Sequence, residues 1–137
     1  MKLRVYSDGA SKGNPGPSAI AFIIFSEDGR PLKKYSKCVG FKTNNQAEYE
    51  ALISALEHAS KITNQEVVCC MDSELVVKHL NGEYKVRNLN LKTLWLKAND
   101  LKHKFRKTSF LHLPRMDNYI QEVDRLANQA LDSIGGK

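Results

Sequence analysis

The order of the predicted secondary structure is the feature that most restricts how this chain can fold. Alternating apolar and polar residues, broken by a Gly/Pro loop and a short turn, predict three strands of an antiparallel meander: 3–8, 18–26 and 31–40. Helical periodicity and short apolar runs then predict these elements in turn: helix 43–60, strand 66–72, helices 73–82 and 91–105, strand 109–114 and helix 118–133. This order predicts an α/β fold with one five-stranded mixed sheet, three strands antiparallel and the last two parallel, and helices on both faces.

The length and composition favour one domain spanning residues 1–137, large enough to bury a core. No apolar run approaches the roughly 20 residues of a membrane span. The N-terminus, MKLRVYSDGAS, lacks the apolar stretch of a secretory signal, so we expect a cytoplasmic protein. Cys38, Cys69 and Cys70 lack zinc-ligand spacing, and reduced thiols are the simpler interpretation.

The positive charge is concentrated in one segment. Residues 85–107 contain eight Lys or Arg and one acid, Asp100, in a chain whose net charge is +6. Such a stripe is typical of a surface that binds a polyanion. The alternative is an ordinary solvated helix face.

Two carboxylates end predicted strands. Asp8 is the last residue of the first strand and Asp72 the last of the fourth, and Asp is also common in turns and at helix starts. If these two strands run parallel, both side chains emerge at the same edge of the sheet, where α/β proteins collect ligands.

Two further carboxylates lie on predicted helices. Asp124 falls among the apolar positions of the last helix, with no Lys or Arg three or four residues away, so a buried and unpaired charge is expected there. Glu48 fits the third position of a capping box that starts at Asn45, yet it also borders the core side. Four such anions brought together by the fold would need cations, and divalent metal is the obvious candidate.

Four motifs in order carry a family resemblance: D-G-A-S-K-G-N-P-G-P, T-N-N-Q-A-E-Y, M-D-S-E-L-V and V-D-R-L-A-N-Q-A-L. Together they resemble ribonuclease H of type 1 over almost the whole chain. The resemblance implies a monomeric endonuclease that cuts the RNA strand of an RNA/DNA hybrid and leaves 5′-phosphate and 3′-hydroxyl ends. It also implies two Mg²⁺ ions, with Mn²⁺ as a substitute, on the four acids: Asp8, Glu48, Asp72 and Asp124.

The resemblance extends to the residues that select the substrate. It implies that the first loop and the start of the next helix recognise the RNA 2′-hydroxyls through these residues: Gly9, Ser11, Gly13, Asn14, Asn44, Asn45 and Gln46. Thr43 and Asn14 match positions that hold a phosphate of the DNA strand.

The chain departs from the family at two places. The catalytic loop before the last acid reads HLPRMDNYIQEVD, and its one His, His112, is expected to be packed within a strand. Arg115, or alternatively Asn118, would take the place of the loop His. The basic, Trp-rich insertion with which some members bind the hybrid is absent, and the stripe at 85–107 would supply part of that binding.

No catalytic role is expected for the other histidines or for the single Trp. Trp95 fits the apolar stripe of its helix, and His58, His79 and His103 are expected on the surface. Three alternatives to an RNA/DNA-specific nuclease remain: a duplex-binding module with weak or no cleavage, a nuclease that also cuts RNA/RNA, and one that cuts structured DNA.

Overall fold

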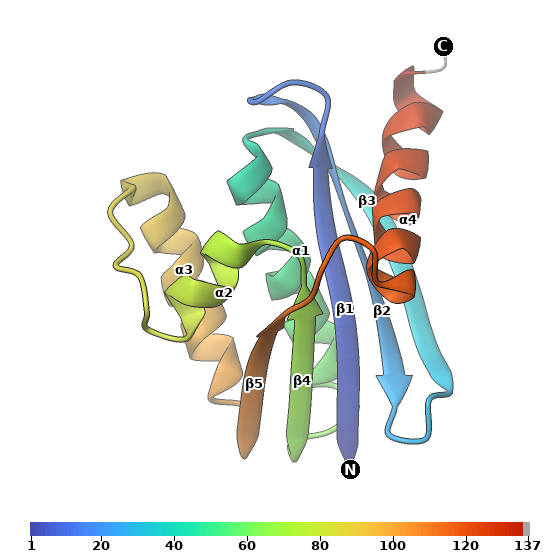
Figure 1. Cartoon of the computed structure of the whole chain (residues 1–137), viewed down its shortest axis with the longest axis vertical. Coiled ribbons are helices and arrows are strands. Elements are labelled where there is room, and N and C mark those ends of the chain that lie inside the picture. The colour runs from blue at the N-terminus through green and yellow to red at the C-terminus, as the bar shows by residue number, and fades with distance from the viewer. Residues whose placement is uncertain (136–137) are drawn as a thin grey trace.

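A computed structural model describes residues 1–135 and shows one mixed sheet with helices on both faces (Figure 1). The strands are β1 (Lys2–Ser11), β2 (Gly16–Ser26), β3 (Pro31–Lys42), β4 (Glu66–Met71) and β5 (Lys107–His112). The helices are α1 (Asn44–Ala59), α2 (Glu74–Leu80), α3 (Leu89–Lys102) and α4 (Asn118–Gly135). Every element predicted from the sequence is present, with ends shifted by a few residues.

The sheet has the strand order β3-β2-β1-β4-β5. β1 and β3 are each antiparallel to β2, whereas β4 is parallel to both β1 and β5. The predicted fold class, antiparallel first three strands and parallel last two, is therefore confirmed. β1 lies at the centre of the sheet, where its antiparallel and parallel halves meet.

Two hydrophobic clusters fill the two sides of the sheet. α1, α2 and α3 cover one face and α4 covers the other, where it crosses β1, β2 and β3 (Figure 1). The apolar run of β4 supplies both sides because successive side chains point to opposite faces: Cys69 belongs to one cluster and Cys70 to the other. All three cysteines, including the half-buried Cys38, are free thiols.

His79 is buried, although the sequence predicted it on the surface. It is buried under α1, and its Nδ1 lies 2.7 Å from the hydroxyl of the fully buried Tyr49. The Trp95 indole N–H donates to the backbone carbonyl of His79 at 3.2 Å, so one residue of α2 is bonded to both α1 and α3. Burial lowers the pKa of His79, which keeps the ring neutral.

The other two helix histidines behave differently from His79. His58 is half-buried and bonds the Ser54 carbonyl, 2.8 Å away, while His103 is exposed at the end of α3, as predicted. Trp95 is half-buried against the core, which confirms its structural interpretation.

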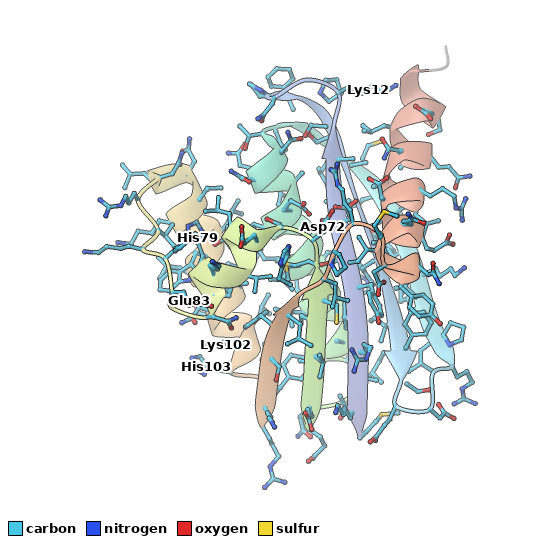
Figure 2. All side chains as sticks on the ribbon, in the orientation of Figure 1. Lys12, Asp72, His79, Glu83, Lys102 and His103 are labelled. Carbon is cyan, nitrogen blue, oxygen red and sulfur yellow. The ribbon has the colours of Figure 1, made fainter. Side chains whose placement is uncertain are left out.

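The basic segment does not form one surface beside the acids. α3 runs away from the acids through the middle of this segment, so that Lys102 and His103 at its end lie far from Asp72 (Figure 2). Within the part of the chain that the structure describes, no helix has the length and apolar character needed to cross a bilayer.

The Tyr49–His79 bond gives a prediction about stability. Tyr49→Phe should lower the free energy of unfolding by about 1–3 kcal/mol, because it leaves the buried Nδ1 of His79 without a partner. Urea denaturation measures this change. The matched control is Tyr84→Phe, which removes a half-exposed hydroxyl bonded to Lys78 and should change the free energy by less than about 0.5 kcal/mol. Equal effects of the two substitutions would show that the buried bond contributes nothing specific.

Candidate metal centre

The parallel pairing of β1 and β4 brings two acids together. Tyr6 lies opposite Cys70 in the register, so two residues further along Asp8 and Asp72 lie at the same level. Asp72 follows the end of β4, whereas Asp8 does not end its strand as predicted, because β1 continues to Ser11 alongside β2. Asp8 is 4% exposed, and the Asp72 side chain is 12% exposed. The convergence predicted from the strand ends is therefore present in the structure.

Glu48 is the third acid, and the start of α1 presents it to the other two. Its Oε1 accepts a hydrogen bond of 2.9 Å from the Gly9 backbone N–H. Glycine is required there because a Cβ would lie 2.6 Å from the Glu48 backbone nitrogen and would also meet the Ala47 backbone. β1 and α1 can thus approach closely enough for Glu48 to reach Asp8.

The predicted capping role of Glu48 is wrong. Thr43, not Asn45, is the N-cap of α1, and Gln46 is the third residue of the capping box. The Thr43 hydroxyl accepts from the Gln46 N–H, and the Gln46 side chain accepts from the Thr43 N–H. Glu48 is consequently free of capping and takes part in the acid cluster instead.

One carboxylate oxygen from each of Asp8, Glu48 and Asp72 lies within 4.8 Å of the others. Burial raises the pKa of Asp8, and the neighbouring charges of Glu48 and Asp72 raise it further. Burial likewise raises the pKa of Glu48, and the charge of Asp72 adds to the shift. The protein therefore holds these anions together at a cost that a bound cation would remove.

The donor set fits a hard divalent cation. Carboxylate oxygens are the ligands that Mg²⁺ and Mn²⁺ favour, and three of them converge here from three separate segments. Within residues 1–135 the single ion pair of these three acids joins Asp72 to Arg115, whose side chain is 86% exposed. One exposed guanidinium leaves most of the clustered negative charge without compensation.

Asp124 lies beside the cluster but is not buried, contrary to its prediction. It is exposed on the flank of α4, while Ile120, Val123 and Ala127 form the buried stripe. Asp124 nevertheless contributes to the raised pKa of Asp8 through a side-chain hydrogen bond and its charge. The Asn128 amide, which the sequence did not single out, donates to Asp124 Oδ1 at 3.2 Å.

The loop between β5 and α4 places Arg115 at the site. Its Nε lies 3.4 Å from Asp72 Oδ2, and both side chains line a hollow of about 320 Å³. The other lining residues are Met116, Ile120, Gln121 and Asp124. His112 lies in a strand, as predicted, but it is the last residue of β5 and is exposed instead of packed. Asn118 is the first residue of α4.

The residues expected to contact the substrate converge in part. Asn14 Oδ1 accepts from the Asn44 N–H at 2.9 Å, which joins the first loop to the start of α1. Asn44 and Asn45 are exposed there. Gly13 has a φ of 93°, a left-handed conformation that suits glycine. The Ser11 hydroxyl is bonded to the Ser18 hydroxyl, 2.6 Å away.

Comparison with known proteins assigns this architecture to the ribonuclease H class. The sequence profile of the family described as reverse transcriptase-like matches residues 6–130. The crystal structure of RNase H1 from Halobacterium salinarum has a TM-score of 0.92 and 38% identity, covering 97% of this chain and 99% of that chain. LC11-RNase H1, solved in complex with an RNA/DNA hybrid, has a TM-score of 0.90 and 39% identity, covering 96% and 98%.

Curated sequences agree with the structures. Ribonuclease HI of Halobacterium salinarum is 40% identical over 131 residues, which are 96% of this chain and 65% of the relative. The bifunctional protein Rv2228c of Mycobacterium tuberculosis is 38% identical over 134 residues, 97% of this chain and 36% of the relative. The chain thus spans under two thirds of the length of these relatives. It belongs to the type 1 ribonuclease H family.

The clustered acids predict an unusual pH dependence for the metal-free protein. The folded-state pKa values of Asp8 and Glu48 lie above their ordinary values of 3.8 and 4.5. The folded state therefore retains protons that the unfolded chain releases, so stability falls as pH rises from about 4 into the alkaline range. Asp8→Asn should raise the free energy of unfolding by at least about 1 kcal/mol near pH 8 in EDTA.

The control for this measurement is Asp100→Asn. Asp100 is exposed on α3 and makes no salt bridge within residues 1–135, so its removal should leave the metal-free stability nearly unchanged. Thermal unfolding of both variants in EDTA makes the comparison. A destabilised Asp8→Asn protein, or stability that rises with pH, would contradict the repulsion inferred from the geometry.

Proposed function

We propose that this chain is an endonuclease that hydrolyses the RNA strand of RNA/DNA hybrids, leaving 5′-phosphate and 3′-hydroxyl ends. The observation that carries the proposal is the convergence of Asp8, Glu48 and Asp72 within 4.8 Å in a member of the ribonuclease H family. The hybrid-bound structure of LC11-RNase H1, 39% identical to this chain, supports the choice of substrate.

The proposed cofactor is a pair of Mg²⁺ ions, which Mn²⁺ would replace. Asp8, Glu48 and Asp72 would hold them, and Asp124 would complete the set from the flank of α4. Two bound divalent ions supply activation of the attacking water and stabilisation of the leaving oxygen.

The side chains of the protein itself have separate tasks. The Gly9 N–H fixes Glu48, and Asp8 is buried within β1, where its backbone pairs with Ala21 of β2, so the donor oxygens are already arranged before substrate binds. Arg115 is exposed beside Asp72, where its guanidinium would bind and orient a non-bridging phosphate oxygen. It would not transfer a proton, because arginine stays protonated near neutral pH.

Substrate selection would come from the joined first loop and start of α1. The proposed contacts to RNA 2′-hydroxyls are Gly9, Ser11, Gly13, Asn14, Asn44, Asn45 and Gln46. Thr43 and Asn14 would hold a phosphate of the DNA strand. The 2.9 Å bond between Asn14 and Asn44 supports this set, since it makes the two segments one surface.

We also propose that residues 1–137 act as a single ribonuclease H domain, as a monomer and in the cytoplasm. The free thiols of Cys38, Cys69 and Cys70 support a reducing compartment.

End-labelled RNA in an RNA/DNA hybrid, incubated with Mg²⁺, tests the activity. The wild type should cut the hybrid, and Asp72→Asn should abolish cutting while hybrid binding remains, because the substitution removes a charged ligand and keeps the shape. Asp100→Asn serves as the control and should cut normally. RNA/RNA and DNA/DNA duplexes form the other arms.

Each arm decides between the proposal and an alternative. Cutting of RNA/RNA at a similar rate would show that the DNA strand is read loosely. Cutting of DNA/DNA alone would identify a different nuclease. Binding of the hybrid without cutting by the wild type would identify a duplex-binding module, and full activity of Asp72→Asn would disprove the metal assignment.

The loop before α4 supplies a separate prediction. Arg115→Ala should lower kcat for hybrid cleavage by roughly tenfold or more, since a charge-assisted phosphate contact contributes about 1.5–3 kcal/mol. His112→Ala, a change at an exposed residue of the neighbouring strand, should leave kcat unchanged. A loss of activity in His112→Ala with none in Arg115→Ala would reverse the two assignments.

A further inference from the structure

Cations without ion-pair partners gather at the end of the sheet opposite the carboxylates. Five of them, called the basal patch, come from the turn after α1 and from the stretch that joins α3 to β5: Lys61, Lys102, Lys104, Arg106 and Lys107. All are exposed except Lys102, which is half-buried. Within residues 1–135 none of the five forms a salt bridge, whereas eight other Lys or Arg side chains do.

Backbone hydrogen bonds hold the segments of the basal patch together. The N–H groups of Arg106 and Lys107 donate to the carbonyls of Asn64 and Gln65, 2.9 and 3.0 Å away, which places them beside the loop that follows α1. The Thr108 hydroxyl donates to the Lys102 carbonyl at 3.0 Å and ties the end of α3 to β5. The positions of these cations are therefore set by ordered backbone.

Acidic residues near the basal patch compensate little of its charge. Glu66 is paired with Lys2 at 3.9 Å, and Glu57 with Lys97 at 4.0 Å. Glu27 shares a hollow of about 430 Å³ with Arg106 and Lys107. Asp100, on the last turn of α3, is a further exposed acid near Lys102 and Lys104. Within residues 1–135 the five cations still outnumber the unpaired acids Glu27 and Asp100, and their mutual repulsion weakens when a polyanion binds.

The basal patch is remote from the candidate metal centre. Lys107 is level with Glu66 at the start of β4, and Asp72 follows the end of that strand. Six residue steps along an extended strand separate the two levels by about 20 Å. Lys102 likewise lies well away from Asp72 in Figure 2.

We propose that the basal patch is a second nucleic-acid-binding surface, which holds the phosphate backbone of a duplex away from the site of cleavage. Lysine and arginine side chains at this density contact phosphates without reading bases, so the surface binds duplexes irrespective of sequence. It would keep the protein on nucleic acid while the carboxylate edge is engaged elsewhere. The proposal goes beyond hybrid cleavage and does not require it.

Binding of a long DNA duplex in EDTA, measured by fluorescence anisotropy over a range of salt concentrations, tests the proposal. Lys104→Ala/Arg106→Ala/Lys107→Ala should reduce the slope of log K against log salt by about two to three, since each lost phosphate contact removes about 0.9. Affinity at low salt should fall at least about tenfold. Lys104→Arg/Lys107→Arg keeps the charge and should bind as the wild type does.

The matched control removes the same charge elsewhere. Lys33→Ala/Lys34→Ala/Lys37→Ala changes three exposed residues of the edge strand β3 and should keep most of the slope. An unchanged slope in the basal variant, or an equal fall in the control, would overturn the proposal. Retention of the wild type by heparin without any binding of the duplex would also overturn it, because the partner would then be another polyanion.

Cleavage of a short hybrid separates this surface from the catalytic one. The basal variant should keep the wild-type kcat, because none of its three substituted residues lies at the carboxylate edge. A large fall in kcat would overturn the proposal by placing the patch within the catalytic surface. Absence of cleavage by the wild type, with duplex binding that still depends on the patch, would disprove the proposed function and leave this inference standing.

Discussion

Asp8, Glu48 and Asp72 repel one another electrostatically, and the fold holds them together against that repulsion. Three carboxylates within 4.8 Å would separate if their backbones allowed it. The β1–β4 register fixes two of them, and the Gly9 N–H fixes the third, so the backbone prevents that separation. The raised pKa values of Asp8 and Glu48 show the cost of this arrangement in the absence of a cation.

The remainder of the molecule supports that arrangement from both sides of the sheet. The core beneath α1 places Tyr49 and His79 in contact, so α1, which carries Glu48, is bonded to α2, which directly follows Asp72. On the other face α4 brings Asp124 to the edge of the cluster. Helices from opposite faces thus deliver acids to the same end of the central strands.

Charge is segregated along the strands. The acids occupy the end where the parallel strands terminate, and the basal patch occupies the end where they begin. Within residues 1–135 the acids have one ion-pair partner, the exposed Arg115, so the proposed metal ions would supply the remaining positive charge needed to offset phosphate at that end. The proposed cofactor and the proposed second surface are two consequences of the same distribution.

The sequence predicts the elements well because each has a strong periodic signal. The convergence of Asp8 and Asp72 also follows from strand order, since β1 and β4 are neighbouring parallel strands and both residues lie two positions beyond the Tyr6–Cys70 pair. The sequence did not show that β1 continues past Asp8 to Ser11 alongside β2. Helical periodicity wrongly predicted a buried Asp124. Periodicity gives the direction in which a side chain points, but it does not show where the sheet beneath α4 ends. Asp124 lies next to the buried stripe and is nevertheless exposed.

The sequence also predicted the wrong N-cap for α1, for a local reason, and the wrong position for His79, for a long-range reason. Thr43 and Asn45 are both good N-cap residues, and the choice between them depends on where β3 ends, which residue type does not reveal. His79 looked like a surface residue because its partner, Tyr49, is 30 positions away in the sequence. Bonds between distant side chains have no periodic signal, so the core contact became visible only in the folded structure.

Anomalous diffraction from crystals grown with Mn²⁺ would show whether the three acids hold metal. We expect an anomalous peak among the carboxylate oxygens of Asp8, Glu48 and Asp72, at about 2.0–2.2 Å from them, the usual distance for such ions and oxygen ligands. The same peak should disappear in crystals of Asp8→Asn. Manganese bound only elsewhere, or a peak that persists in the variant, would contradict the claim that these acids are assembled to hold metal.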